Sequence, residues 1–183
     1  MRSSIIRHVK NFAGFTLLEL LITLVILSIV LGGGVPMLID LVKSSRLKGS
    51  VNDTYALLQY ARSDALRKGE DRYVVWDQNG DKWCAAVAIN ADCNCLSEDC
   101  SIDGVLRQIN SDDYSGVTLV ASGMGSTRFD GLRGLAGGGN GTVRYQLLDG
   151  GTTEAEVRVV VSVLGRVHYC KETGSVGDYP ECE

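Results

Sequence analysis

A long apolar run near the N-terminus constrains the fold of this chain more than any other feature. Between residues 15 and 39 the only polar side chains are those of Thr16, Glu19, Thr23 and Ser28. As an α-helix this run would be ~37 Å long at a rise of ~1.5 Å per residue, which exceeds the ~30 Å hydrocarbon core of a bilayer. We therefore expect a transmembrane helix over residues 15–39 and a separate globular domain after it.

The charges that flank this run predict its orientation. Residues 1–14 carry Arg2, Arg7 and Lys10 and no acidic side chain, and basic flanks of a span stay in the cytoplasm. The globular domain is then expected on the opposite side of the membrane, away from the cytoplasm. The whole chain has a formal net charge of −4 despite its basic start. An acidic domain does not favour general binding to nucleic acid, which would need a local basic patch.

Glu19 is an acid inside the apolar run. An ionised carboxylate there costs roughly 2.5–3.5 kcal/mol on insertion scales, so it requires a cation at similar depth. Cleavage after Gly14 would create that cation, because the new α-amino group of Phe15 lies close to Glu19 in the chain. In a staggered stack of helices, Glu19 of one copy could neutralise the amine of another. The alternative is an uncleaved signal anchor.

Residues 14–21 read Gly-Phe-Thr-Leu-Leu-Glu-Leu-Leu, which resembles the prepilin signature of type IV pilins and pseudopilins. The resemblance implies that residues 1–14 are a leader, that prepilin peptidase cuts after Gly14 and methylates Phe15, and that Glu19 guides assembly. It also implies insertion in the bacterial inner membrane. From there an assembly platform and its ATPase would move the subunit into a filament, where its helix contacts other pilins.

The helix is expected to continue beyond the apolar run. Three glycines at positions 32–34 and a proline at 36 predict a kink or a locally melted stretch, because both residue types weaken a helix. Over residues 40–69 an amphipathic continuation is indicated by spacings of three and four, at Leu47, Val51, Tyr55, Leu58, Arg62 and Ala65. Gly69 is placed to end the helix.

Residues 55–69 narrow the resemblance. They contain an Ala-Arg-Ser-acid-Ala core followed by a basic pair and a glycine, which is similar to the helix end of the GspH/FimT group of minor pilins and pseudopilins. Arg62, Asp64 and Arg67 in this stretch could form a site. We expect instead that they lie on a solvated or intersubunit face of the helix.

The rest of the chain, residues 70–183, predicts a β-rich periplasmic domain. Short β-type segments are expected at residues 72–76, 83–89, 105–109, 117–121, 127–130, 143–148, 156–163 and 166–170. Asn79-Gly80 and Asp149-Gly150-Gly151 are turn sequences between four of them. Short turns join antiparallel strands, so the fold class is α+β, with a long N-terminal helix on a small antiparallel sheet. In residues 156–163 the valines at 157, 159, 161 and 163 share one face.

Six cysteines follow the apolar run: Cys84, Cys93, Cys95, Cys100, Cys170 and Cys182. Four thiolates can bind zinc, but the first four cysteines lack the paired Cys-x2-Cys spacing of structural zinc sites. Export to an oxidising compartment favours disulfides. Cys170 with Cys182 is the pair we expect, because it would hold a loose C-terminal tail. The first four allow three pairings, and their sequence does not choose among them.

Two loops could be ligand sites. The acids and amide around the cysteines, at positions 92, 94, 98, 99 and 103, carry oxygen ligands suited to calcium, but their spacing matches no EF-hand. Five glycines within residues 134–141 could suggest a phosphate loop, yet no lysine follows them and a strand does. We interpret the first as a solvated acidic loop and the second as a mobile connection. No metal and no cofactor is predicted.

Residues 165–170 resemble the Gly-Arg-x-Arg segment of FimT-like minor pilins, which in some members contributes to DNA capture. Here His168 stands where the second arginine would be, and histidine is largely neutral at pH 7. A DNA-contacting patch would still be possible if the strands brought four basic side chains together: Arg144, Arg158, Arg166 and Lys171.

The sequence therefore predicts a minor pilin or pseudopilin, a structural subunit of a type II secretion pseudopilus or a type IV pilus. The alternative is a DNA-binding minor pilin for DNA uptake, and a further one is a membrane-anchored periplasmic domain that does not assemble. The two histidines, His8 and His168, form no recognisable triad with a serine or cysteine. No enzymatic activity is expected.

Overall fold

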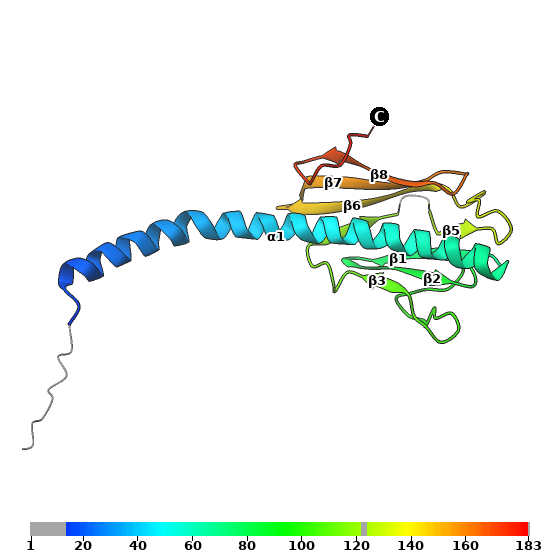
Figure 1. Ribbon diagram of the computed structural model, residues 1–183, viewed down its shortest axis with the longest axis horizontal. Helices are drawn as coiled ribbons and strands as arrows, with labels where there is room; N and C mark the ends of the chain where they lie inside the picture. Colours follow the sequence, from blue (N-terminus) through cyan, green and yellow to red (C-terminus); the bar gives the residue numbers. More distant parts are fainter. Residues whose placement is uncertain (1–13, 122–123, 183) are drawn as a thin grey trace, which may run out of the picture. The chain divides into compact units, whose positions relative to one another are not determined.

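The computed structural model describes residues 14–121 and 124–182. Its only helix in this part of the chain is α1 (Leu17–Lys68), and eight strands follow it (Figure 1). The chain divides into two compact units, with the boundary between Asp40 and Leu41, inside α1. The leader of residues 1–14 expected from sequence lies outside the described residues except for Gly14.

The first unit contributes the apolar part of α1. Its large hydrophobic side chains are exposed along the whole run, and α1 is long and apolar enough to cross a membrane. The backbone is helical without a break from Leu17 to Lys68. The predicted melted stretch at the three glycines is therefore wrong, because a helix that already exists on both sides propagates through a few weak residues more readily than it starts anew. The kink stays a prediction.

The helix ends where the sequence indicated. Gly69 adopts a positive φ of 69°, which a residue without Cβ tolerates. The amides of Gly69 and Glu70 both donate to the carbonyl of Ala65, at 2.9 and 3.2 Å. This C-cap turns the chain into the first strand.

Two four-stranded antiparallel sheets form the second unit together with the later half of α1. The first sheet has the order β3-β2-β1-β5 and the second the order β4-β6-β7-β8. The strands are β1 (Arg72–Asn79), β2 (Lys82–Ala88), β3 (Gln108–Asn110), β4 (Val117–Val120), β5 (Ser126–Phe129), β6 (Gly141–Asp149), β7 (Thr152–Val161) and β8 (Val167–Thr173). The α+β class is confirmed, with two sheets where a single small one was expected.

Both predicted hairpins are confirmed. Asn79 pairs with Lys82 across the first turn and Asp149 with Thr152 across the second.

Two strand predictions differ from the structure. Residues 105–109 are mostly loop, since only the last two belong to β3. Val163 lies beyond the end of β7 and is exposed, so it does not share the buried face of Val157, Val159 and Val161.

One hydrophobic core joins α1 to both sheets. Four of the six residues in the predicted amphipathic stripe are fully buried, namely Leu47, Val51, Leu58 and Ala65. They belong to the same cluster as Trp83 of β2, Tyr145 of β6 and Val159 of β7. The outer face of β1 and β2 is covered separately, by a smaller cluster built around Cys84, Cys95 and Cys100. Both faces of β2 are thus buried, which explains its continuous apolar run.

Candidate functional site

The N-terminal end of α1 carries the residues singled out from sequence. Phe15 precedes the helix and is 81% exposed. Thr16 caps the helix, because its side-chain oxygen accepts a hydrogen bond from the backbone amide of Glu19 at 3.2 Å. This cap was missed by the sequence analysis, although Thr-x-x-Glu before an apolar run is its usual signal. The cap fixes where the helix starts and places Glu19 in its first turn.

The other polar side chains of the apolar run are satisfied within the helix. The hydroxyls of Thr23 and Ser28 donate to the carbonyls of Leu20 and Val25, both at 2.8 Å. Among the described residues, the Glu19 carboxylate has no such partner. In hydrocarbon each unpaired polar group is costly, so Glu19 is the one side chain of this run that needs a partner from outside the helix.

All six cysteines are paired in the second unit. The disulfides are Cys84–Cys95, Cys93–Cys100 and Cys170–Cys182. The last is the pair expected from sequence, and the zinc alternative is wrong because no free thiol is left. Cys84 and Cys95 lie near Asp77 in a group that could suggest a metal site. Both sulfurs are in the disulfide, and the Asp77 carboxylate accepts the Cys95 amide at 2.9 Å.

The start of the glycine-rich segment before β6 is held by hydrogen bonds. The Asp130 carboxylate accepts the amides of Leu132, Arg133 and Leu135 at 3.0, 2.7 and 2.8 Å. These donors lower the pKa of Asp130. The Ala136 amide donates to the Val163 carbonyl at 2.9 Å. The chain is therefore anchored where it enters the glycine-rich segment.

Asp64 does not lie on a solvated helix face, contrary to the prediction from sequence. Asp64 and Arg72 are each 3% exposed and form a salt bridge at 2.7 Å. Arg67 binds the other carboxylate oxygen at 2.5 Å. Burial raises the pKa of Asp64, but the hydrogen bonds and charges of Arg67 and Arg72 outweigh it, so that the pKa is lowered overall. The network ties the end of α1 to the start of β1.

The four basic side chains proposed for DNA contact do not form a free basic patch. Arg158 binds Glu156 at 3.2 Å and Glu172 at 3.0 Å. Lys171 lies 3.6 Å from Glu181. Arg144 is opposite Arg158 in the β6–β7 register, and Arg158 is in turn opposite Cys170 of β8. Arg166 lies just before the first residue of β8, four residues from Cys170. Acidic neighbours thus offset much of the charge, which weakens the DNA hypothesis.

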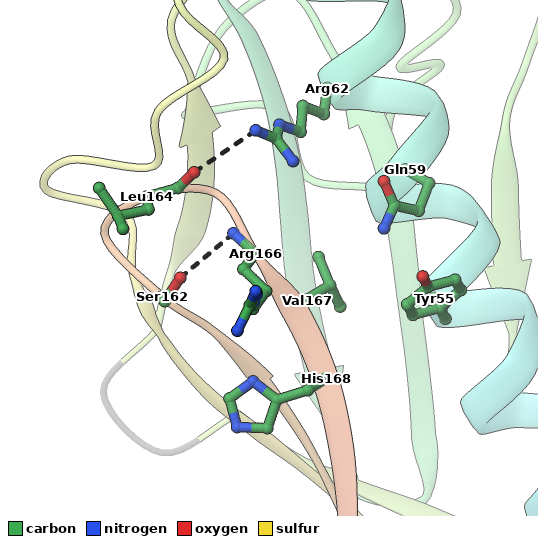
Figure 2. Close-up of a pocket in the computed structure, with 8 residues that line it drawn as sticks. All are labelled: Tyr55, Gln59, Arg62, Ser162, Leu164, Arg166, Val167 and His168. Atoms are coloured by element: carbon green, nitrogen blue, oxygen red, sulfur yellow. Dashed lines mark hydrogen bonds between the residues drawn. The ribbon is translucent and has the colours of Figure 1, made fainter.

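A groove of about 950 Å³ runs beside α1 at the first residues of β8. Tyr55, Gln59 and Arg62 contribute from the helix, Arg166 from the turn before β8, and Val167 and His168 from the first residues of β8 (Figure 2). Arg62 donates through Nε to the Gly134 carbonyl at 3.1 Å. Arg62 and Arg166 are far apart in the sequence, and the fold brings both to one groove.

Two family models match the chain. The model described as type II transport protein GspH matches residues 50–165, which is more than half of the sequence. This chain belongs to the GspH family. The model described as the prokaryotic N-terminal methylation motif matches residues 9–35, which include Gly14, Phe15 and Glu19. The predicted resemblance to GspH-type minor pilins and pseudopilins is thereby confirmed.

Two solved structures are similar to this GspH-family chain. Both are crystal structures of the type IV minor pilin FimU from Pseudomonas aeruginosa strain PAO1, in two crystal forms. The first has 19% sequence identity and a TM-score of 0.47, and the match covers 68% of this chain and 87% of that chain. The second has 19% identity and a TM-score of 0.46, with coverage of 69% and 92%. No curated protein matches the chain.

Membership of the GspH family places the chain among type IV pilin-like structural subunits, a class of proteins that are not enzymes. The apolar part of α1 and the methylation motif fit anchoring in the inner membrane. In this family assembly involves other pilins, which could supply the partner that the Glu19 carboxylate lacks among the described residues.

Proposed function

We propose that this chain is a minor pilin or pseudopilin that is cleaved after Gly14, methylated at Phe15 and assembled into a filament through its N-terminal helix. The observation that carries the proposal is the Glu19 carboxylate. It is the only polar side chain in residues 15–39 without a partner among the described residues, while Thr23 and Ser28 satisfy themselves within α1.

The partner proposed for Glu19 is the α-amino group that cleavage creates on Phe15 of a neighbouring subunit. Within one helix, Glu19 is in the first turn and Thr16 already caps its backbone amide. The exposed side chain of Phe15 marks the end at which the new amine would stand. An ion pair between two staggered subunits would remove the cost of both charges in an apolar setting. The same pair would set the axial offset between neighbours.

The remaining partners follow from this assembly route. Prepilin peptidase would act on the basic leader, and lipid would surround the apolar helix until an inner-membrane platform transfers the subunit to the filament. The type II transport description of the matching family supports a type II secretion pseudopilus. A type IV pilus is the alternative filament, and the globular domain faces the periplasm in both.

Mass spectrometry of the mature chain from its native cell envelope tests the processing. The expected N-terminus is Phe15 carrying one additional methyl group, and it should be lost in cells without the peptidase. Gly14→Leu should leave the chain uncut, whereas Gly32→Leu, a matched change inside the same apolar run, should be processed as in the parent. A chain that begins at Met1 in assembled filaments would contradict the proposal.

A further inference from the structure

The edge of the second sheet is open beside the groove. β8 is the last strand in the order β4-β6-β7-β8. The backbone amide of Ser162, just after β7, donates to the Arg166 carbonyl at 2.9 Å. The backbone carbonyl of Arg166 therefore points toward β7. Because these groups alternate along a strand, Val167 and Tyr169 turn theirs away from β7. In the part of the chain that the structure describes, no hydrogen bond is made by these outward groups.

The C-terminal tail shows how this edge accepts a strand. Glu181 forms a parallel bridge with Lys171. The Lys171 amide donates to the Pro180 carbonyl at 2.8 Å, and the Cys182 amide donates to the Lys171 carbonyl at 3.0 Å. The next bond of this ladder would require an amide hydrogen at Pro180, which proline lacks. The tail therefore pairs at Lys171 and leaves the edge from Tyr169 back to Val167 unpaired.

The groove that continues along this open edge is positively charged. Arg62 and Arg166 line it, and none of its lining residues is acidic. Arg62 already binds two backbone carbonyls, that of Gly134 at 3.1 Å and that of Leu164 at 3.5 Å, the second of which is drawn in Figure 2. For the Arg166 guanidinium no acidic partner is found among the described residues. Arg166 is thus a cation available to a ligand on a chain with a net charge of −4.

A close packing of loops fixes Arg166 at this position. Gly165 has a φ of 72°, and a Cβ there would stand 2.2 Å from the Gly134 carbonyl oxygen. The Gly165 amide donates to the Ser162 carbonyl at 2.8 Å, and the Arg166 amide donates to the Ser162 hydroxyl at 3.2 Å. The turn that presents Arg166 is therefore built into the fold.

We propose that this groove binds an extended, acid-bearing peptide segment of a partner protein, which adds a strand to β8 at Val167 and Tyr169. The backbone groups of these two residues would pair with the segment, as they do in other cases of strand addition. A carboxylate of the segment would bind Arg166. Side chains of the segment that point toward α1 would contact Tyr55 and Gln59. This surface lies in the second unit and does not depend on cleavage or on Glu19.

The test uses the full chain in detergent and short synthetic peptides in which valine alternates with glutamate. Calorimetric or fluorescence titration should show binding of the glutamate peptide with a Kd below about 1 mM. A peptide with lysine in place of glutamate should bind at least about tenfold more weakly, as should the glutamate peptide to Arg166→Glu. Arg133→Glu, an exposed change outside the groove, should leave the affinity for the peptide unchanged.

Backbone methylation separates strand addition from simple charge attraction. Two versions of the peptide carry N-methyl groups on either the valine or the glutamate amides. An added strand turns alternate amides toward β8, so one of the two versions, and only one, should lose binding.

Failure of the glutamate peptide to bind, equal binding by both methylated versions, or equal binding by Arg166→Glu would each overturn the proposal. A short DNA duplex serves as the competing ligand. If the duplex bound this groove with Arg166 dependence while the peptide did not, the site would be for nucleic acid instead.

Discussion

At the level of single residues, the buried pair of Asp64 and Arg72 connects the end of α1 to the start of β1. Both carboxylate oxygens of Asp64 are used, by Arg72 at 2.7 Å and by Arg67 at 2.5 Å. Arg72 also binds the Glu70 carboxylate at 3.1 Å. A buried pair of this kind adds little stability over apolar residues, but breaking it leaves an uncompensated charge. Asp64 thus connects the end of α1 to the start of β1.

Asp64→Asn should lower the free energy of unfolding by about 3 kcal/mol. The loss stays near this value because Glu70 still neutralises Arg72 in part. Urea unfolding followed by tryptophan fluorescence would measure it, since Trp76 and Trp83 are both buried. The control is Asp178→Asn at an exposed position, which should change the value by less than about 0.5 kcal/mol. An equal effect of the two substitutions would contradict this role of Asp64.

The same carboxylate predicts a pH dependence. The pKa of Asp64 is lowered from its ordinary value of 3.8 by its two arginine partners. The unfolded chain therefore binds a proton here at a higher pH than the folded chain does. The stabilisation is fully present above 3.8 and is lost as the pH falls through and below it. The difference in unfolding free energy between the parent and Asp64→Asn should narrow from about pH 5 to pH 2, and a constant difference would be inconsistent with this assignment.

At the level of elements, one hydrogen bond joins α1 to β6 inside the core. The hydroxyls of Thr54 and Tyr145 lie 2.5 Å apart, and both side chains are fully buried. Thr54→Val should cost about 1–3 kcal/mol of unfolding free energy, because the Tyr145 hydroxyl is left without a partner. Adding Tyr145→Phe should recover part of that loss. Strictly additive costs in the same unfolding assay would show that the bond contributes no coupling.

The C-terminal tail is held on β8 by the Cys170–Cys182 disulfide. The double substitution Cys170→Ser and Cys182→Ser should lower stability by about 2–3 kcal/mol, as expected for a short closed loop. Hydrogen exchange at the Lys171 amide should become faster, because its bond to Pro180 depends on the tail. The matched control is the double substitution Cys93→Ser and Cys100→Ser, which opens a different loop. An unchanged exchange rate at the Lys171 amide after loss of Cys170–Cys182 would show that this disulfide does not hold the tail on β8.

Local sequence signals predicted the elements of this fold but not how distant ones combine. The stripe from Leu47 to Ala65, the cap at Gly69 and the Asn79-Gly80 hairpin depend on neighbours within a few residues, and these predictions hold. The division into two sheets depends on the pairing of β1 with β5, far apart in sequence. Short β segments carry no signal for such a choice of partner.

The candidate sites divide in the same way. Gly14, Phe15 and Glu19 lie in one continuous motif and could be named from sequence. The burial of Asp64 could not, because it depends on Arg72 arriving from the next element. The groove at Arg62 and Arg166 also required the fold, since α1 and the β7–β8 turn contribute its two cations. The pairing of Arg158 with Glu172 could not be predicted either, because it follows from the register of β7 and β8, and that of Lys171 with Glu181 depends on the position of the C-terminal tail.

At the level of the whole molecule, the chain joins an apolar helix with exposed side chains to a domain whose core is its own. The domain has one hydrophobic cluster linking α1 and both sheets, together with three disulfides. The N-terminal helix buries none of its most apolar stretch. Its large hydrophobic surface calls for lipid or for other helices. A subunit that moves from membrane to filament would satisfy this surface in both places.

Incorporation of Glu19→Ala into filaments tests the central claim most directly. Filaments sheared from the native host would be compared with the membrane pool by quantitative mass spectrometry, for the parent, for Glu19→Ala and for the matched control Thr23→Ala. We expect Glu19→Ala to remain in the membrane at parental levels while its share in filaments falls about tenfold or more, because the neighbour's amine loses its counter-charge. Thr23→Ala should assemble as the parent does. Parental levels of Glu19→Ala in the filament would contradict the account.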